Sequence, residues 1–182
     1  QTYFSLYREM MLYSVLVLLS LVAAAAGTAL DDYVWKEDEH YGWVDLGPEY
    51  ELAGRSIDGK HSWKSHTLNL TSQKWLEDED YSADSEAKSI WYHMLVVIVP
   101  DTINWKTNGT LWITGHGMGF VPESNFDEDV ALAASLAMGI GCVTGVLFQV
   151  PNEDIIFALD PKQESRGEDA IIAYTWDHYL KD

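Results

Sequence analysis

The stretch that decides the fold begins with LWITGHGMG, residues 111–119, and ends with CVTGVLFQV, residues 142–150. Between these apolar runs, residues 126–139 place apolar side chains at helical spacing, at Val130, Ala134, Ala137 and Met138. A strand, a glycine turn, a helix and a second strand in this order form a βαβ unit, whose crossover is right-handed in almost all proteins. The sequence therefore predicts two parallel strands joined by a helix.

The flanking segments extend this unit into a larger sheet. Residues 91–99 read WYHMLVVIV, which is almost unbroken apolar sequence, and residues 66–73 alternate weakly, as in an edge strand. Residues 166–180 form a second candidate helix, and Asn125 with Glu128 is expected to cap the first. Continuous apolar strands that alternate with helices are typical of a mainly parallel sheet with helices on both faces, so the expected fold class is α/β.

The N-terminus has the composition of a secretory signal peptide. Arg8 precedes an apolar run at residues 10–22, and residues 23–29 are mainly small side chains. We expect residues 1–29 to form the signal peptide and signal peptidase to cleave before Leu30, with cleavage after Ala26 as the alternative. The expected location is therefore the secretory-pathway lumen or the extracellular space.

Two further points concern this leader. Residues 1–9 are expected to lie upstream of the initiator methionine. A membrane anchor is the competing interpretation, because the uncharged span at residues 10–30 is just long enough to cross a bilayer. Two aspartates follow this span, without an aromatic or basic anchor, so we favour cleavage and expect no stable membrane anchor.

Sequons and cysteine usage fit a secreted chain. Asn69 and Asn108 each begin an Asn-x-Thr sequon without proline, and both are expected to be glycosylated. Cys142 is the single cysteine, so this chain forms no internal disulfide framework. Cys142 is expected to be a small buried side chain, and a disulfide partner in a missing C-terminal part is the alternative.

Charge and composition exclude several classes of protein. The 182 residues include 29 acidic and 11 basic side chains, for a formal net charge of −18, and the few basic residues form no stripe. Such a chain is poorly suited to bind nucleic acid. Because 47% of the residues are hydrophobic and 13% are aromatic, the chain can bury a core and is not expected to be disordered.

The glycine loop at residues 115–119 is the candidate functional element. Dinucleotide binding requires glycines that run straight into a helix and an acidic residue about twenty positions later, whereas here Pro122 intervenes and the acid is missing. Two interpretations remain. The glycines either make a tight strand-to-helix turn, or they present the backbone N–H groups of Gly117, Met118 and Gly119 to a substrate oxygen as an oxyanion loop.

The remaining motifs supply no complete catalytic or metal site. Residues 54–58 read GRSID, which fails the G-x-S-x-G pattern of a nucleophile elbow, so no catalytic triad can be assembled. The six histidines lack the spacing of metal ligands, and we expect neither a metal nor another cofactor. His93, within an apolar run, is expected to be a hydrogen-bonded core histidine.

Several segments in the same order resemble the PhoPQ-activated pathogenicity-related family of secreted α/β-hydrolase-like proteins. The resemblance covers nearly all of residues 30–181. The segments that carry it are LDDYV at 30–34, Tyr41-x-Trp43, L-x-L-T-S-Q-x-W-L at 68–76, Trp91-x-His93 leading to Pro100-Asp101, QVPN at 149–152 and R-x-E-D-x-I-I-A-Y-x-W at 166–176. The chain departs from the family at the glycine loop, where His116 and Met118 interrupt glycines that are usually consecutive and followed by asparagine.

The resemblance implies an α/β-hydrolase fold whose serine elbow and remaining triad members follow residue 182. Residues 30–182 would then be the N-terminal part of a single truncated domain, of peptidase or esterase type and inactive alone. A member similar to this chain is a secreted repressor of cell proliferation, so a non-catalytic binding or growth-regulating protein is the alternative. The expected partner is accordingly a small-molecule or peptide substrate, or a cell-surface receptor.

Overall fold

The protein is described here by a computed structural model that covers residues 28–181. The chain divides into two units, one ending at Asp38 and the other running from Glu39 to the C-terminus. The first unit contains α2 (Ala29–Val34), which begins at Thr28 because the Thr28 hydroxyl and the Asp31 carboxylate form a capping box. Apart from Thr28 and Ala29, the predicted signal peptide lies outside the described residues.

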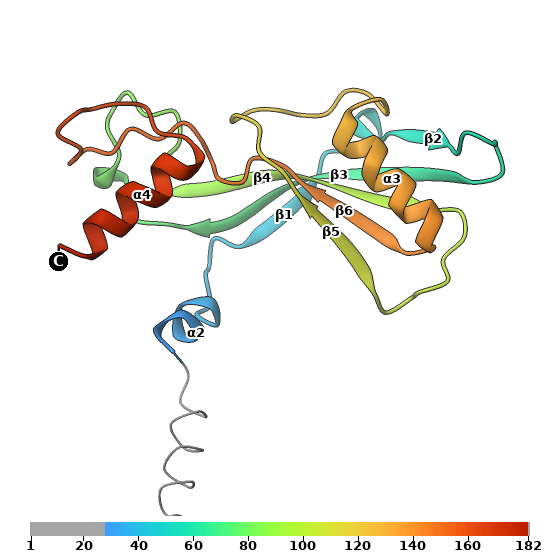
Figure 1. Cartoon of the computed structure of the whole chain (residues 1–182), viewed down its shortest axis with the longest axis horizontal. Helices are drawn as coiled ribbons and strands as arrows, with labels where there is room; N and C mark the ends of the chain where they lie inside the picture. The colour runs from blue at the N-terminus through green and yellow to red at the C-terminus, as the bar shows by residue number, and fades with distance from the viewer. Residues whose placement is uncertain (1–27, 182) are drawn as a thin grey trace, which may run out of the picture. The chain divides into compact units, whose positions relative to one another are not determined.

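The second unit is built on a six-stranded sheet (Figure 1). The strand order is β1-β3-β4-β6-β5, and β2 also pairs with β3. The strands are β1 (Gly42–Asp45), β2 (Ala53–Arg55), β3 (Ser62–Lys74), β4 (Ile90–Pro100), β5 (Gly109–Ile113) and β6 (Val143–Leu147). The protein is therefore of mixed α/β class.

The prediction of a mainly parallel sheet is wrong, because four of the five strand pairings are antiparallel. Only β5 and β6 run parallel, as the βαβ pattern predicted. A parallel neighbour requires a crossover of a dozen or more residues, usually through a helix, and residues 75–89 contain only the short 3-10 turn Asp78–Asp80. The chain consequently returns from β3 into β4 as a long antiparallel pair.

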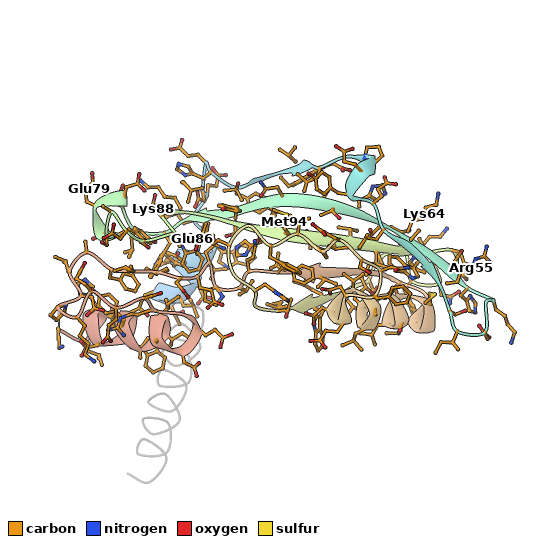
Figure 2. All side chains as sticks on the ribbon, turned by 90° about the horizontal axis from the view of Figure 1, so that it is seen from above. Arg55, Lys64, Glu79, Glu86, Lys88 and Met94 are labelled. Carbon is orange, nitrogen blue, oxygen red and sulfur yellow. The ribbon has the colours of Figure 1, made fainter. Side chains whose placement is uncertain are left out.

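The predicted edge strand at residues 66–73 belongs to β3 and lies inside the sheet, between β4 on one side and β1 with β2 on the other. Figure 2 shows the length of this pair: Met94 lies near the middle, Arg55 and Lys64 toward one end and Glu79 toward the other. Burial alternates in the first half of β3, where Trp63, Ser65 and Thr67 are buried and Lys64 and His66 are exposed, and this alternation is lost in the second half.

The main core lies between one face of the sheet and α3 (Glu128–Ile140). Four small or β-branched residues of α3 are buried, and they pack on β4 and β6 at Met94, Val96, Ile98 and Val146. Asp127 caps this helix, because its carboxylate accepts hydrogen bonds of 3.1 Å from the N–H groups of Asp129 and Val130. The predicted cap at Asn125 is wrong: its amide donates to Ala53 O, at 2.9 Å.

A second cluster lies beside α4 (Glu168–Tyr179), away from α3 (Figure 1). Its buried members are Tyr81, Ala87, Ile155, Phe157 and Ile171. Arg166 organises the surrounding loops, since Nε donates to Asp160 Oδ2 at 2.7 Å and the guanidinium lies over the ring of Tyr174. Ser165 and Glu168 have the S-x-x-E spacing of a capping box, but Gly167 is the N-cap of α4 and no side-chain hydrogen bond caps the helix.

Within residues 39–181, the helices do not cover both faces of the sheet as predicted. Opposite α3, an uncovered face is formed by Leu95, Val97, Leu111, Ile113 and Leu147. The apolar run at residues 111–114 suggests a strand covered on both faces, but this interpretation is wrong, because Leu111 and Ile113 in β5 are 56% and 57% exposed. No helix within residues 28–181 is long and apolar enough to span a membrane.

Candidate functional site

The glycine loop lies at the carboxyl ends of the two parallel strands. Beyond the strands, pairing continues through Thr114, whose N–H donates to Leu147 O at 2.9 Å and whose carbonyl accepts from Val150 N at 3.2 Å. Residues 115–120 then leave the sheet and lead to α3. In open α/β sheets, ligands bind in the crevice outside the carboxyl ends of the strands. The loop therefore occupies a position suited to substrate contact.

Gln149 joins this loop to the sheet. Its side chain is fully buried, and its amide oxygen accepts a hydrogen bond of 2.9 Å from Met94 N in β4. The amide nitrogen donates to Gly117 O at 3.4 Å and to Phe120 O at 3.3 Å. One side chain thus forms hydrogen bonds with backbone groups of both β4 and the loop. The backbone of Gln149 is left-handed (φ 63°), so the extended conformation of β6 does not continue through this residue.

Asn152, three residues after Gln149, also forms side-chain hydrogen bonds with the backbone of β4. Its buried side chain accepts from Tyr92 N at 2.9 Å and donates to Tyr92 O at 2.8 Å. These two bonds reproduce the pair that a neighbouring strand residue would form with Tyr92. The polar residues of the segment QVPN therefore continue the sheet where Pro151 interrupts the backbone.

Alternate peptide groups of the glycine loop are held by hydrogen bonds. The Gly115 carbonyl accepts from Gln149 N, Met118 N donates to Glu153 O at 3.2 Å, and Phe120 N donates to Gly117 O at 3.3 Å. The N–H groups of Gly117 and Gly119 donate to no acceptor within residues 28–181. Both glycines are exposed. Of the three predicted donors, the loop thus presents Gly117 and Gly119, whereas the N–H of Met118 is already bonded.

His116 stabilises the loop by stacking. Its ring lies 3.9 Å from the ring of Phe120 at an interplanar angle of 11°, and 5.6 Å from the ring of Phe148. Its backbone is left-handed, with φ 81°. The His116 side chain therefore packs the loop against two aromatic rings.

The structure also pairs a serine with a histidine, which sequence reasoning missed. Ser72 Oγ lies 2.8 Å from Nε2 of His93, and the other ring nitrogen lies 3.1 Å from the carbonyl oxygen of Phe148. Because that carbonyl only accepts, Nδ1 carries the proton and Nε2 accepts from the Ser72 hydroxyl. The two residues are 21 positions apart, and they meet through the antiparallel register of β3 and β4 at the irregularity between Thr71 and Gln73.

The environment of His93 identifies it as a core histidine, which confirms the sequence prediction. The side chain is 4% exposed, and burial lowers the pKa of His93 below 6.5, although its contacts with the backbone of Phe148 and Gln149 oppose this shift. The imidazole is therefore neutral at pH 7. The ring is oriented by a carbonyl rather than a carboxylate, so the pair lacks the third member of a serine-hydrolase triad.

We predict that acid destabilises the fold through His93. In the unfolded chain His93 takes up a proton near pH 6.5, whereas the folded state binds it only at lower pH, so the free energy of unfolding falls as the pH drops below 6.5. Urea unfolding at pH 7.5 and pH 5 should show a larger loss for the parent than for His93→Gln, which cannot titrate. Equal losses in the two proteins would contradict this prediction.

The predicted glycosylation sites have different surroundings. Asn108 is exposed and directly precedes β5. Asn69 lies within β3, opposite Val44 and Met94, and its side-chain oxygen is buried without a hydrogen-bond partner among residues 28–181. Asn108 is therefore the more accessible acceptor.

The side chains that could bind a metal ion do not form a cluster among the described residues. Within residues 28–181, no group of three or more His, Cys, Asp or Glu side chains is placed to hold a metal ion. Two histidines pair instead with carboxylates at the surface: His61 lies 3.6 Å from Asp101, and His66 lies 3.4 Å from Glu51. Cys142 is buried, as predicted, with its sulfur 3.6 Å from the Thr110 hydroxyl.

Fold and site together define a mixed α/β protein with a glycine loop at the carboxyl end of a parallel strand pair. Residues 30–182 match the family described as PhoPQ-activated pathogenicity-related protein, and the chain belongs to this family. The match covers the sheet, both clusters and the glycine loop.

One curated relative is autocrine proliferation repressor protein A from Dictyostelium discoideum, which is 31% identical over 167 residues. The aligned region is 91% of this chain but 30% of that protein, so the chain spans less than a third of the length of this relative. No solved structure matches the chain significantly.

Proposed function

We propose that this chain is the N-terminal part of a secreted α/β-hydrolase-like protein of peptidase or esterase type. The observation that carries the proposal is the glycine loop between β5 and α3, with the N–H groups of Gly117 and Gly119 exposed and unbonded within the described residues. In α/β-hydrolases a loop between a strand and the next helix contributes a backbone donor to the oxyanion hole. Such donors stabilise the negative oxygen that develops during acyl transfer.

In this proposal the reaction is divided between two parts of one domain. The loop contributes oxyanion donors, and Gln149 with His116 fixes their position. The nucleophile, the general base and the acid belong to polypeptide that follows residue 182. The matched relative supports this division, since 70% of its length lies outside the aligned region (100% − 30%). The 182-residue chain alone is accordingly inactive.

The enzymatic part of the proposal predicts turnover by a longer product of the same gene and none by the 182-residue chain. Both proteins are assayed with generic ester and peptide substrates. Gly117→Pro in the longer product removes one oxyanion donor and should lower kcat by about 10²–10³. A Cβ at Gly117 would contact nothing within 4 Å, so Gly117→Ala, which keeps the N–H group, should leave kcat nearly unchanged.

A non-catalytic growth regulator on the same fold is the second candidate. The name of the Dictyostelium relative, a proliferation repressor, favours it. This candidate predicts that the folded longer product slows cell growth without hydrolysing any substrate. If the longer product showed no turnover, and if both the parent and Gly117→Pro slowed growth equally, the growth regulator would be the preferred function.

If the protein is secreted, we expect its signal peptide to be removed and its sequons to be glycosylated. Protein recovered from culture medium should begin at Leu30 or Gly27, and an endoglycosidase should increase its gel mobility. Asn108→Gln should remove one glycosylation step, because Asn108 is exposed, whereas Asn69→Gln should have the smaller effect. Recovery only from membranes with the leader intact, or secreted protein without a mobility change, would contradict this prediction.

A further inference from the structure

Asp129 joins the two elements on either side of the glycine loop. It is the second residue of α3, and it is half-buried. Its Oδ1 atom accepts a hydrogen bond of 2.7 Å from Nε1 of Trp112 in β5. Its Oδ2 atom accepts one of 3.0 Å from the hydroxyl of Thr114, the residue that directly precedes the loop. Because both bonds end on one carboxylate, the first turn of α3 is attached to the end of β5.

These two hydrogen bonds are not needed to begin α3. The helix is capped by Asp127, whose carboxylate already accepts from the N–H groups of Asp129 and Val130. The Asp129 carboxylate is instead used by side chains of the preceding strand, and hydrogen bonds to an ionised acceptor are stronger than those to a neutral one. Asp129 therefore closes the base of the connection at residues 115–127.

The connection that Asp129 closes contains the exposed N–H groups of Gly117 and Gly119. Glycine has more backbone freedom than any other residue, so donors on a glycine loop keep one position only where other groups hold the loop. Gln149 holds the middle of the loop, through Gly117 O and Phe120 O. Asp129 holds its two ends.

We propose that Asp129 is a positioning residue for the hydrolase reaction, because it holds the glycine loop where Gly117 and Gly119 can donate to the substrate oxygen. The inference rests on the proposed function, which assigns these two N–H groups to an oxyanion loop. Asp129 acts through the loop and contacts no substrate. Oxyanion donors stabilise the transition state best when their positions are fixed before the reaction, so a loosened loop lowers kcat more than it raises KM.

Substitution of Asp129 in the longer product tests this role. Removal of one oxyanion donor lowers kcat by about 10²–10³, and Asp129→Ala keeps both donors but loosens them, so we expect a loss of about tenfold with KM changed less than about twofold. Asp129→Asn should recover most of this loss, because its oxygen can accept from Trp112 and its nitrogen can donate to the Thr114 hydroxyl. Titration of the reactive serine to completion with a fluorophosphonate refers kcat to active protein, so a loss of stability alone would not lower it.

Glu128→Ala is the matched control. Glu128 is exposed in the same turn of α3, and its side chain forms no hydrogen bond with residues 28–181. Its loss removes the same favourable charge from the helix N-terminus without touching β5, so kcat should stay at the parental value.

Two further variants leave Asp129 in place, so the test does not depend on the folding of Asp129→Ala. Trp112→Phe and Thr114→Val each remove one of the two hydrogen bonds and nearly preserve the volume of the side chain. Each should lower kcat by about threefold in the longer product. In the Asp129→Ala background, Trp112→Phe should cause no further loss, because residues that act through one contact are not additive.

Hydrogen exchange tests the attachment without using activity. The amides of Met118 and Phe120 are hydrogen-bonded, to Glu153 O and Gly117 O. In the longer product they should exchange at least about threefold faster in Asp129→Ala than in the parent or in Glu128→Ala. Absence of turnover in the parent would contradict the proposed function, whereas parental exchange in Asp129→Ala would contradict this inference, so the two failures are distinguishable.

A kcat loss and faster loop exchange that occur in Asp129→Ala and are largely reversed in Asp129→Asn would support the inference. It would be overturned if Asp129→Ala kept the parental kcat, or if Glu128→Ala lost as much activity as Asp129→Ala. Parental kcat in both Trp112→Phe and Thr114→Val would also overturn it, because the proposed attachment runs through these two side chains.

Discussion

Val146→Asp is expected to prevent stable folding. Val146 lies in β6 between Val96 of β4 and Trp112 of β5, is fully buried, and belongs to the core beneath α3. An aspartate there exchanges apolar burial for a carboxylate within a cluster of apolar side chains. The combined cost is about 4 kcal/mol or more, a large share of the roughly 5–15 kcal/mol that stabilises a typical domain.

The measurement is the secreted yield together with the denaturant midpoint of any protein recovered. Ile57→Asp introduces the same charge at a fully exposed position and should change the free energy of unfolding by no more than about 0.5 kcal/mol. Secretion of Val146→Asp at the parental yield, with an unchanged midpoint, would show that β6 is not a central strand.

Gln149→Leu is expected to have the second largest effect. Leucine removes the oxygen that accepts from Met94 N and the nitrogen that donates to Gly117 O and Phe120 O. Because the side chain is fully buried, water cannot form these hydrogen bonds in its place. Each buried polar group left unpaired costs about 1–3 kcal/mol, so the variant should lose about 3 kcal/mol. The glycine loop should also become mobile, which faster hydrogen exchange at residues 115–120 would reveal.

Gln163→Leu is the matched control for this substitution. Gln163 also has a left-handed backbone, with φ 51°, and its amide nitrogen likewise donates to backbone carbonyls, including Phe157 O at 2.9 Å. Because Gln163 is exposed, water can replace those bonds, and the loss should be below about 1 kcal/mol. Equal losses for the two variants would mean that burial of the Gln149 amide does not stabilise the loop.

Periodicity located the elements but not the direction of the strands. Residues 91–99 lie within β4 as predicted, yet only alternate residues such as Val96 and Ile98 are fully buried, because α3 covers one face. An apolar run reads alike in parallel and antiparallel sheets. The direction depended on the connection at residues 75–89, which contains no α-helix to return the chain for a parallel pairing.

The candidate site was predictable only where it is local in sequence. The glycine loop stands out as GHGMG, whereas its attachment through Gln149 depends on a fold that brings residues 117 and 149 together. The available signal was a pair of amide side chains, Gln149 and Asn152, beside Pro151 in otherwise apolar sequence. Likewise, the pairing of Ser72 with His93 follows from the β3–β4 register and from no sequence spacing.

The most direct test of the account is the position of the serine that a fluorophosphonate probe labels. The 182-residue chain and the longer product are treated at pH 7.5, and the modified peptide is identified by mass spectrometry. The account predicts labelling of the longer product on a serine beyond residue 182 and no labelling of the short chain. Labelling at Ser72, beside the neutral His93, would contradict it by showing that the nucleophile lies within the described residues.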